Sequence, residues 1–168
     1  MLNVEAGSSA SEAAISKITN LEWTGLGRAA DLVWLTFGSA VKWRNYKGEL
    51  VDRSQYALHL QCPFRISLQG TAKLGSSDVS LSADDQVADS SSLLPKKATA
   101  FDVKAAAITS DIGLSKVASA AVSGLGDIYI GFENGLVLET LAVASDDSES
   151  WRIISFEEPR FEFVFPDT

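Results

Sequence analysis

The clearest pattern in the chain is an alternation of apolar and polar positions between residues 56 and 66. A period of two over this length predicts a half-buried strand whose apolar set faces inward. Pro63 has no amide hydrogen to donate to a neighbouring strand, so it predicts an edge strand or a bulge at that point. The inward set is Tyr56, Leu58, Leu60, Cys62, Phe64 and Ile66.

Shorter apolar runs predict further strands joined by tight turns. Residues 32–37 form an apolar strand that Gly38 closes, and residues 43–48 read as an exposed loop. Asn134–Gly135 is a strong hairpin signal, because a type I′ turn needs positive φ at both central residues. A two-residue loop there places Ile130 opposite Glu139. Four more strands are expected at residues 71–74, 117–122, 151–156 and 161–165.

Helices are few in this pattern. Ser9 and Glu12 fit a capping box and predict an N-terminal helix over residues 9–20, and Asp102 predicts one further short helix. The serine- and aspartate-rich stretch 78–100 predicts a long surface loop. We therefore expect a single α+β domain over residues 1–168, with a mainly antiparallel sheet that is strongly curved or barrel-like.

Charge and cysteine content narrow the classes of function. The chain has 168 residues and a net charge of −8. The charges of residues 1–84 sum to zero, whereas residues 85–168 carry six basic and fourteen acidic groups. An acidic half repels phosphate backbones, which disfavours nucleic acid and suits a partner with a basic surface, although solubility alone also explains it.

Other features bear on compartment and cofactors. No apolar run approaches the ~20 residues of a membrane-spanning helix, so no membrane partner is expected. Cys62 is the single cysteine and His59 the single histidine, which disfavours a zinc site and leads us to expect no metal or cofactor. A lone cysteine cannot form an internal disulfide, which favours a reducing compartment, and we expect a cytoplasmic location.

Two stretches collect charged and aromatic side chains without a core periodicity, and both are candidate protein interfaces. Tryptophan, tyrosine and arginine are enriched at interface hot spots, whereas an acidic turn would meet a basic partner. For the aromatic stretch, a solvated loop with its tryptophan packed on the core is an equal alternative. The candidate binding residues are Trp43, Arg44 and Tyr46 in the first stretch, and Asp146, Asp147 and Glu149 in the second.

A pocket is the alternative kind of site. In the predicted hairpin Glu139 lies on an apolar face, so its carboxylate should be paired or should have a raised pKa, unless that face is wet. Arg65 and Arg152 could pair with Glu139 and, with His59, line a pocket for a small ligand or a reaction. His59 and Cys62 point to opposite faces of an unbroken strand, so no catalytic residue is assigned.

Four segments carry a resemblance to a known group of proteins: Leu58–Ile66, Gly75–Asp78, Gly131–Gly135 and Trp151–Ile153. Together they resemble a family of uncharacterised bacterial proteins, some of which look like the immunity proteins that accompany secreted toxins. The shared motifs are strand and turn signatures. The resemblance implies a cytoplasmic α+β protein with a protein-binding role, which makes a non-enzymatic binding domain the leading hypothesis. A homodimer is a further expected partnership.

Overall fold

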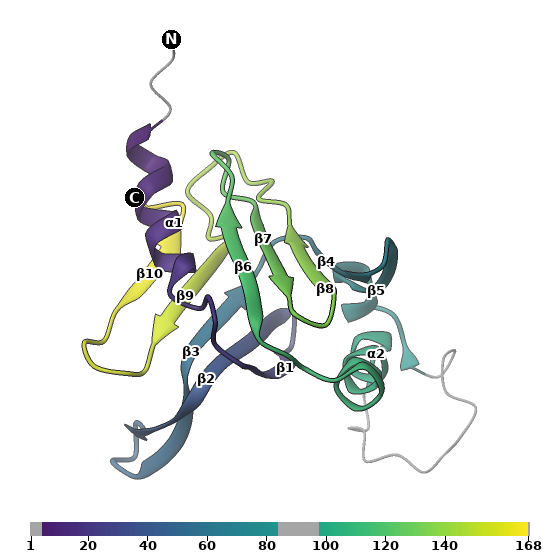
Figure 1. The fold of residues 1–168 in the computed structure, drawn as a ribbon, viewed down its shortest axis with the longest axis horizontal. Helices are drawn as coiled ribbons and strands as arrows, with labels where there is room; N and C mark the ends of the chain where they lie inside the picture. Colours follow the sequence, from purple (N-terminus) through teal and green to yellow (C-terminus); the bar gives the residue numbers. More distant parts are fainter. Residues whose placement is uncertain (1–4, 84–97, 168) are drawn as a thin grey trace.

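The computed structural model describes residues 5–83 and 98–167, which form two open antiparallel sheets and two helices (Figure 1). The α+β, antiparallel prediction is confirmed, but neither sheet closes or curls strongly, so the barrel-like form is not supported. The first sheet has the order β1 (Trp23–Ala29), β2 (Leu32–Arg44), β3 (Leu50–Leu60), β9 (Trp151–Ser155) and β10 (Glu162–Phe165). The second has the order β5 (Thr71–Gly75), β4 (Phe64–Leu68), β8 (Leu136–Thr140), β7 (Ile128–Phe132) and β6 (Val117–Val122).

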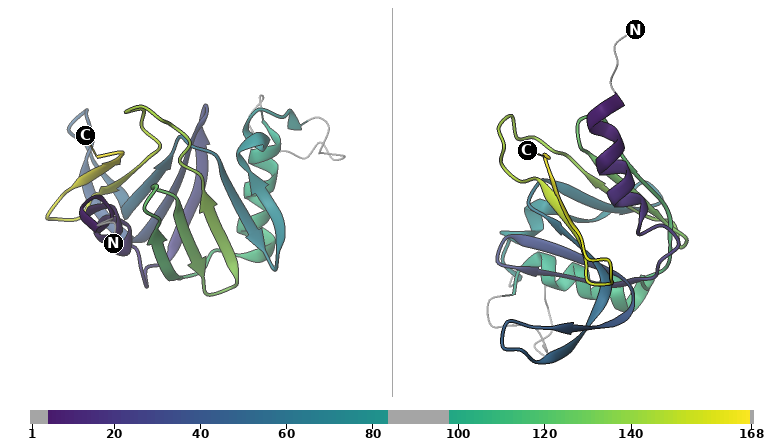
Figure 2. Two further views of the ribbon diagram at one scale, coloured as in Figure 1. Left: turned by 90° about the horizontal axis from the view of Figure 1, so that it is seen from above. Right: turned by 90° about the vertical axis from the view of Figure 1, so that its left-hand side faces the viewer.

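The helices lie at opposite ends of the sheets (Figure 2). An N-terminal helix is present as α1 (Glu5–Ser16), which packs against β6, but it begins and ends four residues before the predicted range 9–20. Ser9 therefore lies inside the helix and not at its cap. At the other end, α2 (Ala100–Ala107) continues into the π-helical turn η3 (Ile108–Ile112) and packs beside β5 and β1.

The loop predicted over residues 78–100 lies largely outside the described residues. Its first part is not a surface loop, because it begins within the short helix η1 (Ser76–Val79). Asp78 is 6% exposed there and accepts hydrogen bonds from the Gly75 amide and from Lys104 Nζ on α2. The carboxylate is buried because it ties η1 to α2.

The inward set of the alternating run is confirmed, since every member from Leu58 to Ile66 is buried. The run is nevertheless two strands in two different sheets, because β3 ends at Leu60 and β4 begins at Phe64. Pro63 cannot donate to a ladder, which fits the break at this point. The crossover at residues 61–63 therefore joins the two sheets around one hydrophobic core.

β2 and β3 continue past the core as a projecting hairpin, and residues 40–54 are called the arm below (Figure 1). Gly38 does not end the strand as predicted. It sits in a bulge between Phe37 and Ala40, with a φ of +87° that a glycine adopts without strain. Trp43 and Arg44 consequently lie on a strand, and the exposed turn is confined to residues 45–49.

The hairpin predicted at Asn134–Gly135 is present as β7 and β8, but its register differs by one residue. Tyr129 lies opposite Glu139, and Ile130 lies opposite Leu138. The loop holds three residues instead of two, and its glycine has a φ of +90°. Such a shift exchanges the faces of a strand relative to its partner, so Glu139 lies on the outer face while Leu138 is fully buried.

Candidate functional site

Arg65 and Glu139 pair directly on the outer face of the second sheet. They are register partners on β4 and β8, and both Arg65 Nε and Nη2 donate to Glu139 Oε2. The side chain of Arg65 is 60% exposed and that of Glu139 is 33% exposed. This is a solvent-screened ion pair on an open face, and it does not enclose a ligand.

Arg152 and His59 lie on the first sheet, as register partners on β9 and β3. The Arg152 guanidinium binds the carboxylates of Glu149 and Glu162. Burial lowers the pKa of His59, and the positive charge of Arg152 lowers it further. Arg152 therefore does not meet Glu139, and the four predicted pocket residues form two separate groups on two sheets.

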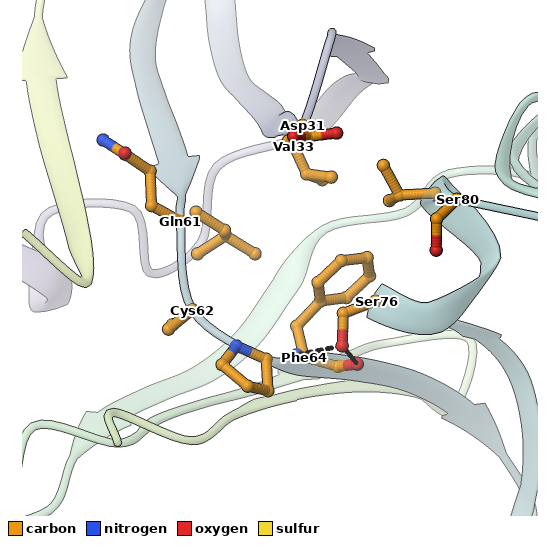
Figure 3. Close-up of a pocket in the computed structure, with 10 residues that line it drawn as sticks. Asp31, Val33, Gln61, Cys62, Phe64, Ser76 and Ser80 are labelled. Carbon is orange, nitrogen blue, oxygen red and sulfur yellow. Dashed lines mark hydrogen bonds between the residues drawn. The ribbon is translucent and has the colours of Figure 1, made fainter. Parts of the chain in front are cut away.

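A different pocket of about 330 Å³ opens beside the crossover between the sheets (Figure 3). Two of its polar side chains, Ser76 and Ser80, are already hydrogen-bonded within the fold. The Ser76 hydroxyl bonds the backbone of Phe64, and the Ser80 hydroxyl donates to the carbonyl of Ser77. Asp31 stands at the rim, while Gln61 points away from the cavity. The lining is completed by Val33, Leu60, Cys62, Pro63 and Val79.

We predict that Cys62 is chemically inert in the folded protein. The residue is 8% exposed, and burial raises the pKa of its thiol, so little reactive thiolate forms. A disulfide exchange reagent should release its chromophore only as urea unfolds the chain. Rapid stoichiometric labelling under native conditions would contradict this and would point to cysteine chemistry in the pocket.

Two loops at one end of the molecule expose large apolar side chains beside carboxylates. Leu125 is 79% exposed on the β6–β7 turn, and Leu141 and Val143 are 54% and 62% exposed on the connection from β8 to β9. Asp146 and Asp147 follow on the same connection and are exposed. We call Leu125, Leu141, Val143, Asp146 and Asp147 the loop-end surface.

One hydrogen bond joins these two loops, and a second joins the β6–β7 turn to β9. The amide of Ala142 donates to Asp127 Oδ1 over 2.8 Å, and the Trp151 indole donates to the carbonyl of Gly126 over 2.8 Å. Gly126 has a φ of +89°, and a Cβ there would meet the ring of Phe165 at 2.0 Å, so only glycine fits. The apolar tip residue Leu125 is therefore presented by a fixed turn.

The residues of the predicted acidic turn lie in two different environments in the structure. Glu149 is bound to Arg152 and its side chain is only 18% exposed, so it is not available to a partner. Asp146 Oδ1 accepts the amide of Ser148, and both Asp146 and Asp147 are exposed. The three apolar members of the loop-end surface were not predicted as a site. Leu141 and Val143 continue the apolar run that predicts a strand over residues 136–143, whereas β8 ends at Thr140. Leu125 lies between Gly124 and Gly126, and this apolar residue in a glycine-rich turn was the available signal.

The residues of the predicted aromatic stretch also differ in exposure. The Trp43 ring is half-buried, with the Arg160 guanidinium 4.2 Å from its centroid. The Phe156 ring packs edge-on against it, with the two ring centroids 4.9 Å apart. Arg44 Nη1 donates to the carbonyl of Gly48, and Tyr46 is 94% exposed at the tip of the arm. Trp43 thus anchors the arm to the segment after β9, while Tyr46 is the side chain that a partner could reach.

Within residues 5–83 and 98–167, no three histidine, cysteine, aspartate or glutamate side chains are grouped to hold a metal ion. Across the same residues, no helix has the length and apolar character needed to cross a membrane. No protein-family model, curated protein or solved structure matches the chain.

Proposed function

We propose that this chain is a non-enzymatic, immunity-like protein-binding domain whose loop-end surface binds a partner with a basic surface. The observation that carries the proposal is the exposure of Leu125, Leu141 and Val143 on two loops that the Asp127–Ala142 hydrogen bond joins. Large apolar side chains grouped on an otherwise polar surface are characteristic of protein-interaction sites. Hydrogen bonds hold the turn that carries Leu125 and the backbone of residues 141–142, and a backbone held in this way loses little entropy on binding.

Charge supports a basic partner. Asp146 and Asp147 follow Val143 on the same exposed connection, and Arg152, the basic side chain of the neighbouring strand, is neutralised by Glu149 and Glu162. Complementary charge speeds encounter and selects against wrong partners. A cytoplasmic location belongs to the same proposal, and the one buried cysteine is in keeping with it.

A small-ligand site is the second candidate function. The pocket beside Phe64 favours it, since about 330 Å³ lies at the lower end of the range for ligand cavities. Against it, the Ser76 and Ser80 hydroxyls are bonded within the fold, and the raised pKa of Cys62 disfavours a nucleophile. The alternative site around Glu139, Arg65 and Arg152 has no shared cavity to support it.

The test is capture of a partner from extract of the source cell, followed by binding measurements on surface variants. We expect Leu141→Ser to weaken binding by about tenfold, as loss of an apolar contact at an interface does. Leu81→Ser is the matched control, because Leu81 is 52% exposed and its carbonyl accepts the amide of Ala100 at the start of α2. The double variant Asp146→Lys/Asp147→Lys should also weaken binding, whereas Asp111→Lys/Glu133→Lys changes the net charge equally at other sites and should not.

Equal affinity of the Leu141→Ser and Leu81→Ser variants would overturn the proposal. If binding of a small molecule were instead found, Asp31→Asn and Ser80→Ala would distinguish the pocket from the loops. Loss of that binding in the pocket variants, with the loop variants unaffected, would favour the second candidate.

A further inference from the structure

The arm is a basic element in an acidic protein. Residues 40–54 contain four basic and two acidic side chains, against a net charge of −8 for the whole chain. Lys42 is paired with Asp52. Among the described residues, Arg44, Lys47 and Arg53 form no ion pair, so their positive charge is available to a second molecule.

The tip of the arm is held rigid. Asn45 Oδ1 accepts the amides of Lys47 and Glu49 at 2.9 and 3.0 Å, which fixes the turn. Tyr46, 94% exposed, and Leu50, 60% exposed, stand at this tip with Arg44, Lys47 and Glu49. The tip therefore offers an aromatic and an aliphatic side chain together with positive charge, which is the complement of the loop-end surface.

The arm cannot reach the loop-end surface of its own chain. In Figure 1 the tip of the arm lies at the lower left, while the β6–β7 and β8–β9 loops rise at the top. The right-hand view of Figure 2 shows the same separation. Contact between these two surfaces therefore requires two molecules.

We propose that the arm of one copy binds the loop-end surface of a second copy, head to tail. Tyr46 meets the apolar side chains of the loops, and Arg44 and Lys47 meet Asp146 and Asp147. This inference rests on the proposed function in one respect, namely that the loop-end surface is a docking surface. Because the two contacting surfaces differ, the interface is heterologous and propagates into chains or closes into a ring.

A consequence is competition. A second copy and a basic partner use the same loops, so a partner that binds them releases the arm of the neighbouring copy. The self-associated form then dissociates when a partner that binds the loops more tightly is present.

The experiment uses two variants of the full chain in sedimentation velocity at low salt. The arm variant is Tyr46→Ser/Lys47→Glu, and the loop variant is Leu141→Ser/Asp146→Lys. Wild type should form larger species as its concentration rises from micromolar to millimolar, and should return to monomer at high salt. Each variant alone should remain monomeric, because one side of every contact is lost. A variant carrying Leu81→Ser/Asp111→Lys should associate like wild type.

Mixing the two variants gives the decisive result. The intact arm of the loop variant can bind the intact loops of the arm variant, so an equimolar mixture should form 1:1 dimers and nothing larger. A monomeric wild type, a monomeric mixture or self-association by either variant alone would overturn the inference.

The two proposals fail separately. The arm variant keeps its loop-end surface and should still bind a captured basic partner. Partner binding without self-association would contradict only the head-to-tail inference. A loop variant that keeps full partner binding would contradict the proposed function.

Discussion

Replacing Trp151 with alanine is expected to lower the free energy of unfolding by about 4 kcal/mol. Trp151 is fully buried as the first residue of β9, and its ring stacks on Phe165 with centroids 5.3 Å apart. Its indole also donates to the carbonyl of Gly126, so one side chain joins the core to the turn that presents Leu125. Alanine would leave a cavity and an unsatisfied buried carbonyl.

Urea denaturation followed by circular dichroism measures this loss. Trp151→Phe keeps most of the ring but removes the donor, and should cost about 1–3 kcal/mol. Tyr129→Ala is a suitable control, because Tyr129 is 51% exposed on the outer face and should change the midpoint little. A loss under 1 kcal/mol for Trp151→Ala, on the scale of an ordinary surface substitution, would show that the ring is not a core element.

Replacing Asp102 with asparagine is expected to cost about 2–3 kcal/mol, since it breaks a largely buried ion pair. Asp102 Oδ1 accepts Arg28 Nε at 3.0 Å, and Oδ2 accepts Arg28 Nη2 at 2.7 Å and the amide of Thr99 at 2.8 Å. The carboxylate therefore caps α2 and fastens it to β1. Both side chains are less than a fifth exposed, at 17% and 16%, so solvent screens the pair weakly.

This pair also sets a pH dependence. Burial raises the pKa of Asp102, but hydrogen bonds from Arg28 and Thr99 lower it more, and the net pKa lies below the ordinary value of 3.8. A lowered carboxyl pKa stabilises the fold at pH above 3.8, and that stabilisation is lost as pH falls through the pKa of the folded state.

Urea unfolding at a series of pH values tests this dependence. Asp102→Asn should reduce the loss of stability that wild type shows as the pH falls below 3.8. Asp52→Asn is the control, because the Lys42–Asp52 pair is 69% and 62% exposed and should contribute nothing measurable. An Asp102→Asn protein with the acid sensitivity of wild type would contradict the role of this carboxylate.

Alternation along the chain was sufficient to predict the buried face of residues 58–66, because burial alone sets a period of two. The change of sheet at Pro63 was not predictable. The proline indicates an interruption, but the partners of β3 and β4 lie far along the chain, and their choice depends on the whole core. The two-sheet order follows from such distant pairings, as does the absence of a barrel.

The position of Glu139 shows how a small error in a turn propagates. The Asn134–Gly135 pair predicted a two-residue loop, whereas the structure has a three-residue loop with glycine in the left-handed region. One added residue moved Glu139 from an apparently apolar face to the open face that it shares with Arg65 and Tyr129. The predicted pocket around Glu139 depended on the incorrect register.

The candidate site was predictable only in its charges. Asp146 and Asp147 stand out in the sequence as an acidic turn, but Leu125 comes from a separate turn that Asp127 joins to Ala142. The Arg28–Asp102 pair is similarly hidden, because its members are 74 positions apart. Sequence patterns report local order, and these contacts arise only when the sheets have assembled.

The most direct test of the central claim is the association rate of wild type with a captured partner, measured across salt concentrations. Acidic steering predicts a fall of about tenfold as the screening length shrinks from ~30 Å at 0.01 M to ~3 Å at 1 M. The Asp146→Lys/Asp147→Lys variant should associate more slowly and should lose most of this salt dependence. A rate that neither salt nor this charge reversal changes would contradict binding through the loop-end surface.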